Sequence, residues 1–184
     1  NMETVEDYAD RAPGFYAEHG ADERSFEITI RGIGQLGGSA NNFGLYLDEF
    51  ELTGMANGNV GADLADIERI EVLRGPQGTA FGRNVIAGAV SLTSVKPTSD
   101  EVYGSAELES TSFGGRNARA SVNMPLVEGV AGMRFTGAYR SSDGYLKNTG
   151  SSGQSNDYEN TAWRAALRLT PNERFTVDLA ASTQ

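Results

Sequence analysis

Cysteine is absent from the 184-residue chain, and histidine occurs only once, at His19. The absence of cysteine excludes a disulfide framework and any cysteine-based metal site. A single histidine excludes metal motifs built on paired histidines and argues against a Ser-His catalytic relay. We therefore expect no metal site, no cofactor and no catalytic residues, and we expect a protein that is not an enzyme.

Positive charge is also scarce, because 15 Lys and Arg stand against 25 Asp and Glu and the formal net charge is −10. Nucleic-acid binding needs clustered Lys and Arg, so nucleic acid is excluded as a partner. No apolar run reaches the roughly 18–20 residues that a membrane-spanning helix needs. No basic-then-apolar export signal opens the chain, so we expect any signal sequence to have been removed or never included.

Glycine is abundant, with 23 residues against 5 prolines. In the first half of the chain, short apolar segments alternate with Gly-rich loops, which predicts a small α+β unit over residues 1–97. A short helix is expected over 3–11, and a helical turn over 64–69. Strands are expected over 26–31, 43–52, 70–73 and 87–95, and Gly-rich connections over 32–42, 53–63 and 74–84.

After Pro97 the pattern changes to strict alternation of apolar and polar residues. Trp163, Ala165 and Leu167, for example, alternate with arginines and an alanine. Segments of about ten residues match strands that cross a bilayer with tilt, and short turns opposite one long loop over 141–160 are typical of outer-membrane barrels. The same alternation is also typical of a soluble antiparallel sheet with one solvent-exposed face, so both interpretations stay open at this point. The five segments are 102–113, 117–126, 131–140, 163–170 and 175–182.

The run from Ile67 to Val95 carries the most specific pattern. It reads IERIEVLRGPQGTAFGRNVIAGAVSLTSV, and it resembles the plug domain of TonB-dependent outer-membrane receptors. The matching elements are the strand at 67–72, the Leu-Arg-Gly-Pro-x-Gly turn at 73–78, the Gly-Arg-Asn bend at 82–84 and the apolar strand at 87–92. Ile30-Arg31-Gly32 resembles the family's Ile-Arg-Gly element. Leu45–Asp48 resembles its Val-Tyr-Val-Asp strand, although Glu49 replaces the usual glycine.

The resemblance implies an α+β plug domain, truncated at its N-terminus, over residues 1–97. It implies that residues 98–184 are the first five or so antiparallel transmembrane strands of a β-barrel that is incomplete, since such barrels have about 22 strands. The implied function is active uptake of a scarce nutrient, such as a ferric siderophore, cobalamin or a glycan, across the bacterial outer membrane. The implied partners are the nutrient or chelate, the periplasmic TonB complex and outer-membrane lipid.

The resemblance also implies roles for particular residues. Arg31, Arg74 and Arg83 are expected to pair with carboxylates on the lumen wall, because the guanidinium fork suits carboxylates. The apical plug loops, 33–43 and 53–63, are expected to touch the substrate, and their amide, aromatic and thioether groups suit a neutral polar ligand. An alternative is that these side chains lie on the loops without contacting the substrate. The residues are Asn41, Asn42, Phe43, Met55, Asn57 and Asn59.

The sequence also admits two other interpretations. Asp48, Glu49 and Glu51 alternate along a predicted strand and lack the loop spacing of a calcium cage, so a solvated or salt-bridged face is favoured over a metal site. A soluble β-rich binding or adhesion module without transport activity is the alternative to a transporter.

Overall fold

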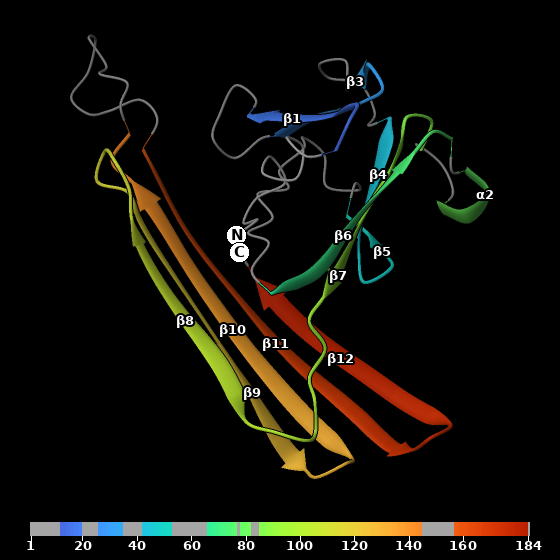
Figure 1. Ribbon diagram of the computed structural model, residues 1–184, viewed down its shortest axis with the longest axis vertical. Coiled ribbons are helices and arrows are strands. Elements are labelled where there is room, and N and C mark those ends of the chain that lie inside the picture. The colour runs from blue at the N-terminus through green and yellow to red at the C-terminus, as the bar shows by residue number, and fades with distance from the viewer. Residues whose placement is uncertain are drawn as a thin grey trace. The chain divides into compact units, whose positions relative to one another are not determined.

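The computed structural model describes residues 12–19, 26–34, 42–52, 66–76, 78–81, 85–144 and 157–183 (Figure 1). The chain divides into two compact units, unit 1 over Asn1–Val95 and unit 2 over Lys96–Gln184. The predicted helix over 3–11 lies outside the described residues. None of the helices in these ranges is long and apolar enough to cross a membrane.

The larger sheet of unit 1 has four strands in the order β5-β4-β7-β6. At its centre β4 (Phe43–Leu47) lies parallel to β7 (Gly88–Ser94). The flanking strands are antiparallel, with β5 (Phe50–Glu51) beside β4 and β6 (Ile67–Arg74) beside β7. Both central strands are almost wholly buried, and their apolar side chains supply much of the core of unit 1.

A second, antiparallel sheet of unit 1 joins β1 (Phe15–His19), β2 (Phe26–Ile30) and β3 (Ile33–Gly34). The predicted strand over 26–31 is therefore confirmed, whereas β1 was not predicted. The two sheets share one apolar core, because residues from both are buried together. The buried members are Phe15, Ile28, Ile30, Phe43, Leu45, Ala87, Val90 and Leu92.

Helix is sparse in the described part of unit 1, where only α2 (Gly78–Phe81) is assigned. This single turn covers a small second core of Tyr46, Val85 and Ala89, with Phe81 packed against it. Among the residues that the structure describes, the α component of the predicted α+β class thus consists of the four residues of α2.

The predicted helical turn over 64–69 is wrong from Ile67 onward, because β6 already begins there. A register shift between Ile67 and Arg69 interrupts the pairing with β7. The extra residue of such a bulge returns the strand to the same face after three residues instead of two. Ile67 and Ile70 both pack against the core for this reason.

The strand predicted over 43–52 is interrupted at its middle. Asp48 and Glu49 form a two-residue turn between β4 and β5, with φ values of 48° and 74°. Two positive φ angles are the signature of the tight hairpin turn that suits the twist of paired strands. Asp48, Glu49 and Glu51 therefore do not alternate along one strand as predicted, and no cluster of metal-binding side chains occurs in the parts of the chain that the structure describes.

Unit 2 is one antiparallel sheet of five strands in the order β12-β11-β10-β9-β8. All five segments predicted from alternation are strands, and their neighbours in sequence pair in register. Within residues 96–183 the sheet does not close, so β8 and β12 are its two edges. The strands are β8 (Tyr103–Ser110), β9 (Arg116–Val127), β10 (Ala131–Ser142), β11 (Tyr158–Asn172) and β12 (Phe175–Thr183).

Candidate functional site

The pairing register of unit 2 collects the apolar side chains on one face of the sheet. One row runs across four strands from Val122 through Phe135 and Ala165 to Ala181. Phe135 also stacks on Trp163 of the neighbouring strand, with ring centroids 6.5 Å apart. Because side chains alternate across a strand, every second residue of these strands belongs to this apolar face.

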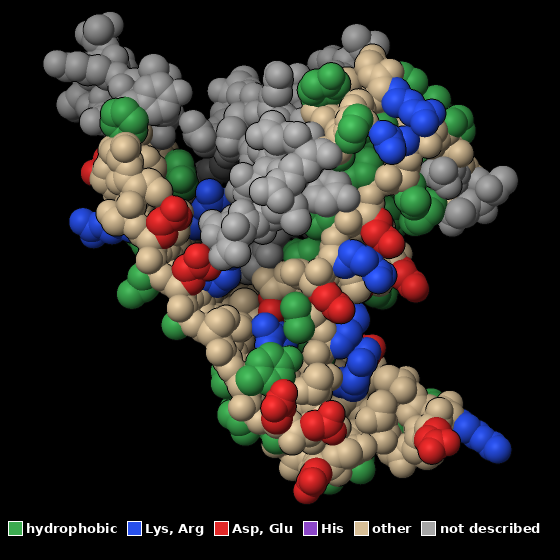
Figure 2. Space-filling model, viewed as in Figure 1, with side chains coloured by type: hydrophobic (Ala, Val, Ile, Leu, Met, Phe, Trp, Pro, Cys, Tyr) green, Lys and Arg blue, Asp and Glu red, His purple; other side chains and the backbone are tan. Residues whose placement is uncertain are grey.

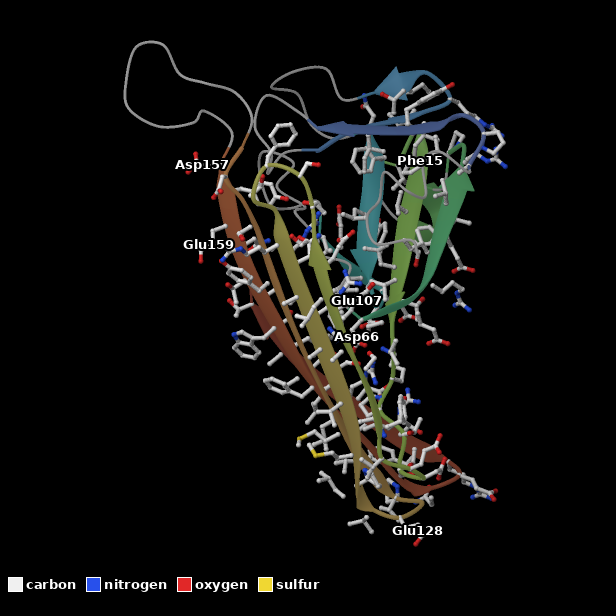
Figure 3. All side chains as sticks on the ribbon, turned by 60° about the vertical axis from the view of Figure 1, so that its left-hand side comes forward. Phe15, Asp66, Glu107, Glu128, Asp157 and Glu159 are labelled. Atoms are coloured by element: carbon white, nitrogen blue, oxygen red, sulfur yellow. The ribbon has the colours of Figure 1, made fainter. Side chains whose placement is uncertain are left out.

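The opposite face is polar and carries cross-strand ion pairs. Nε and Nη2 of Arg168 on β11 donate hydrogen bonds of 2.7 and 2.8 Å to the carboxylate of Asp178 on β12. Arg119 on β9 lies 4.0 Å from the carboxylate of Glu107 on β8. Figure 3 shows Glu107 projecting from this face and Glu159 from the other. Charged residues are therefore sorted to one side along most of each strand, and we call this side the polar face.

Arg134 connects three strands of the polar face. Its Nη2 donates to the Ser121 hydroxyl of β9 at 3.1 Å, and its guanidinium carbon lies 5.5 Å from the centre of the Tyr103 ring on β8. Ser121 in turn shares a hydrogen bond of 3.0 Å with Ser105. Such contacts hold neighbouring strands in register and fix the guanidinium over the sheet.

Burial in unit 2 is the reverse of that in a water-soluble sheet. On the polar face Arg134 is 7% exposed and Thr136 is 1% exposed. On the apolar face Leu108 is 84% exposed and Trp163 is 43% exposed. Figure 2 shows hydrophobic side chains gathered along one margin of unit 2. A soluble sheet buries its apolar face, so this arrangement favours a sheet whose apolar face meets lipid.

In unit 1 the structure brings two of the three predicted ion-pairing arginines to the same turn. Nη1 of Arg74 donates to the carbonyl of Pro13 at 2.7 Å. Arg31 has a φ of 53°, and its backbone N–H donates to the carbonyl of Gly14 at 2.7 Å. Both side chains are exposed, and the structure gives neither guanidinium a carboxylate partner among the residues it describes. Arg83 lies outside those residues.

Two of the predicted substrate-binding residues are described. Asn42 is partly buried, and its Nδ2 donates to the carbonyl of Gly34 at 3.0 Å, which ties the start of β4 to the end of β3. Phe43 is 5% exposed and belongs to the core of unit 1. These two side chains therefore hold the start of β4 in place. The other predicted residues lie outside the described ranges: Asn41, Met55, Asn57 and Asn59.

Sequence reasoning missed two polar side chains that organise unit 1. The Tyr46 hydroxyl donates to the carbonyl of Phe81 at 2.5 Å and so holds α2 against the sheet. Burial, together with the nearby carboxylate of Glu51, raises the pKa of the Tyr46 phenol. Asp48 accepts hydrogen bonds from Ser94. No spacing in the sequence links these partners, because each pair forms only when the sheet is assembled.

Comparison with known proteins places these features in a family. Residues 1–89 match the family model described as "TonB-dependent Receptor Plug Domain". The chain is 36% identical over 117 residues to the ferrioxamine B receptor of Salmonella typhimurium, an alignment that covers 62% of this chain and 16% of that receptor. It is 30% identical over 131 residues to the ferrichrome outer membrane transporter/phage receptor of Escherichia coli, covering 70% and 17%. The aligned part thus spans 16–17% of these curated relatives.

Solved structures share the fold. The ferric yersiniabactin uptake receptor of Yersinia pestis superposes with a TM-score of 0.85 at 22% identity, over 99% of this chain and 29% of that receptor. The pyoverdine outer membrane receptor of Pseudomonas aeruginosa superposes with a TM-score of 0.78 at 22% identity, over 98% and 25%. At this level of identity the likeness shows the fold alone.

The family match, the curated relatives and the shared fold agree with one another. The chain belongs to the TonB-dependent receptors of the bacterial outer membrane.

Proposed function

We propose that this chain provides the plug domain, over residues 1–97, and the first barrel strands, over 98–184, of a transporter for a ferric siderophore. The family match over residues 1–89 carries the proposal. The exposed apolar face and the polar face of unit 2 support a barrel wall between lipid and an aqueous lumen. Radiolabelled ferric siderophore uptake by cells that carry the full-length receptor, compared with a deletion strain, is the direct test.

The names of the relatives favour one substrate class. They are receptors or transporters for ferrioxamine B, ferrichrome, ferric yersiniabactin and pyoverdine. This favours a ferric siderophore over the cobalamin or glycan that the sequence leaves open. Uptake of cobalamin or of an oligosaccharide, with no uptake of any ferric siderophore, would contradict the assignment.

We place the substrate contacts on the two Gly-rich loops of the plug. Asn41, Met55, Asn57 and Asn59 offer amide and thioether groups, whereas Phe43 belongs to the core of unit 1. Replacing Asn41 and Asn57 by alanine in the full-length receptor should weaken siderophore binding by about tenfold if each contributes roughly half of a 1.4 kcal/mol loss. Unchanged affinity would remove them from the site.

A matched control for this experiment lies in unit 2. Asn172 is the exposed last residue of β11, and its Oδ1 accepts a hydrogen bond from the backbone N–H of Arg174 in the following turn at 3.1 Å. Its replacement by alanine alters an exposed asparagine outside the plug loops, so siderophore affinity should stay unchanged.

Energy for transport is proposed to come from the periplasmic TonB complex. The exposed guanidiniums of Arg31 and Arg74, with Arg83, would hold the plug through carboxylates on the wall until that complex displaces it. Uptake should therefore stop in cells that lack TonB, while siderophore binding at the cell surface persists. Uptake that continues without TonB would contradict energy coupling.

A soluble binding or adhesion module is the other candidate function. It would leave Leu108, Phe135 and Trp163 in water, which is costly for so many large apolar side chains on one face. Recovery of the full-length protein in the outer-membrane fraction, with heat-modifiable gel mobility, is expected for the transporter. Recovery wholly in the soluble fraction would favour the module.

A further inference from the structure

Residues 98–101 lie on the polar face of unit 2 before the chain enters β8, and we call them the strap. Asn123 of β9 is 0% exposed, and its side chain binds the strap through four hydrogen bonds. Its Oδ1 accepts from the backbone N–H of Thr98 at 3.0 Å. Its Nδ2 contacts the carbonyl of Thr98 at 3.1 Å, the Thr98 hydroxyl at 3.0 Å and the carbonyl of Glu101 at 2.8 Å.

The carboxamide both accepts and donates here, and because Nδ2 carries only two hydrogens, at least one of them is shared between two of its three acceptors. One side chain both accepts from and donates to the backbone of Thr98, as a neighbouring strand would. An aspartate at this position could accept but could not donate, and an aliphatic residue could do neither. The polar groups of Thr98, which is partly buried, thus have Asn123 as a hydrogen-bond partner.

The next strand is shaped to receive the strap. A Cβ added to Gly132 of β10 would overlap the carbonyl oxygen of Thr98, lie 2.6 Å from its carbon and 3.1 Å from the nitrogen of Ser99. Only glycine permits so close an approach of two backbones. The N–H of Gly129 also points at the carbonyl of Ser99, at 3.4 Å. The strap is therefore seated on β9 and β10 near the turn that Figure 3 marks with Glu128.

The chain is also fixed on the unit 1 side. The backbone N–H of Val95 donates to the carbonyl of Asp66 at 2.9 Å, directly after β7 ends. Asp66 is labelled in Figure 3. Between this bond and the first bond of the strap lie only Lys96 and Pro97. Residues 96 and 97 thus connect two segments that are each held by hydrogen bonds.

We propose that Asn123 and Gly132 form an anchor that keeps the strap on the barrel wall throughout transport, so that rearrangement of the plug is confined to residues upstream of Thr98. The inference rests on the proposed function, because only a moving plug needs a fixed tether. The anchor lets the plug change shape or place while its last attachment to the wall, and the register of β8 that follows, stay unchanged.

A reversible covalent lock tests whether the strap stays in place. Residues 1–184 contain no cysteine, so Thr98→Cys with Asn123→Cys in the full-length receptor gives this part of the protein one cysteine pair, at side chains that are in contact. A disulfide should form under oxidant and replace the attachment that the Asn123 amide provides. The oxidised receptor should therefore take up ferric siderophore at a rate within about twofold of the wild type, whereas the reduced receptor, which lacks that amide, should take up less. Loss of uptake on oxidation that reductant restores would overturn the proposal, as would failure of the pair to cross-link.

Release of the strap is the converse test. In Asn123→Ala, the Thr98 amide of the full-length receptor should exchange hydrogen about tenfold faster or more, because its buried partner is gone. Uptake should fall while siderophore affinity and heat-modifiable mobility are unchanged. Unchanged exchange at Thr98, or full uptake with the strap released, would contradict the anchor. If the wild-type receptor takes up no ferric siderophore, the proposed function fails, whereas the exchange rate still reports on the anchor.

Discussion

The carboxylate of Asp48 binds Ser94 twice, although the two residues are far apart in the sequence. Oδ2 accepts from the Ser94 hydroxyl at 2.6 Å, and Oδ1 accepts from the Ser94 backbone N–H at 3.0 Å. Ser94 ends β7 and is 1% exposed. The aspartate of the β4–β5 turn therefore completes the hydrogen bonding at the end of the neighbouring parallel strand.

Replacing Asp48 by alanine should open this end of the sheet. The buried N–H and hydroxyl of Ser94 would each lose a charged acceptor, a change worth about 1–3 kcal/mol. The amide of Ser94 in the full-length receptor should then exchange hydrogen roughly ten to a hundred times faster. Asp48→Asn is the matched variant, because it keeps one acceptor oxygen and should show a smaller increase. Equal rates in the wild type and in Asp48→Ala would contradict a stabilising role.

Glu49 occupies a backbone conformation that favours glycine. Its φ is 74° and its side chain is exposed. A left-handed conformation destabilises the folded state of a residue with a Cβ by about 1–2 kcal/mol, and glycine avoids this cost. The greater freedom of glycine in the unfolded chain offsets up to about 1 kcal/mol of that advantage. Glu49→Gly should therefore stabilise the hairpin by up to about 1 kcal/mol relative to Glu49→Ala, which removes the charge but keeps the Cβ.

Hydrogen exchange at Leu52 measures this effect. The N–H of Leu52 donates to the carbonyl of Leu45 at 2.7 Å and closes the hairpin. Exchange of this amide should be slower in Glu49→Gly than in Glu49→Ala. Slower exchange in the alanine variant instead would contradict a backbone cost of the Cβ at position 49.

The turn at Glu49 also shows what the sequence could predict. The resemblance marked this position as one where the family has glycine, yet alternation of apolar residues predicted one continuous strand through it. Composition alone does not reveal the turn, because glutamate carries no turn signal. The bulge in β6 is likewise not visible as alternation, because it brings Ile67 and Ile70, which are three residues apart, against the same core.

In unit 2 the prediction succeeded because the strands are long and each repeats the same period. Alternation gave all five strands, and the faces follow directly from it. What the sequence could not supply were contacts between distant segments, such as that of Asn123 with Thr98. Asn123 fits the alternation as one more polar residue, and its role depends on where the strap lies.

The raised pKa of the Tyr46 phenol makes the stability of the second core of unit 1 depend on pH. Burial is the main cause of the raised pKa of its phenol, with the carboxylate of Glu51 adding to it. The neutral phenol is the form that the fold favours, so its contribution is fully present below the unfolded pKa of about 10 and is lost as pH rises through the folded pKa. In a titration followed by phenolate absorbance, Tyr46→Phe should remove one tyrosine that ionises late. Removal of an early-ionising tyrosine would contradict the raised pKa.

The same substitution tests the attachment of α2 at neutral pH. Tyr46→Phe keeps the ring contact with Phe81, whose centroid is 4.8 Å away, but removes the donor to the Phe81 carbonyl. Loss of one neutral hydrogen bond should cost about 0.5–1.5 kcal/mol. Proteolysis of the full-length receptor near residues 78–81 should accelerate accordingly, and no change there would show that the ring contact alone holds α2.

Two neighbouring residues of β12 provide a matched test of which face meets lipid. Leu179 belongs to the apolar face and Ala180 to the polar face, and both are exposed. In a soluble sheet an arginine would be tolerated at either exposed position. In a barrel wall an arginine on the lipid side costs about 2–4 kcal/mol near the bilayer midplane, whereas the lumen side accepts it. Leu179→Arg should therefore reduce the amount of heat-modifiable receptor in the outer membrane, while Ala180→Arg leaves it near the wild-type level. Equal assembly of the two variants would show that the apolar face of unit 2 does not contact lipid.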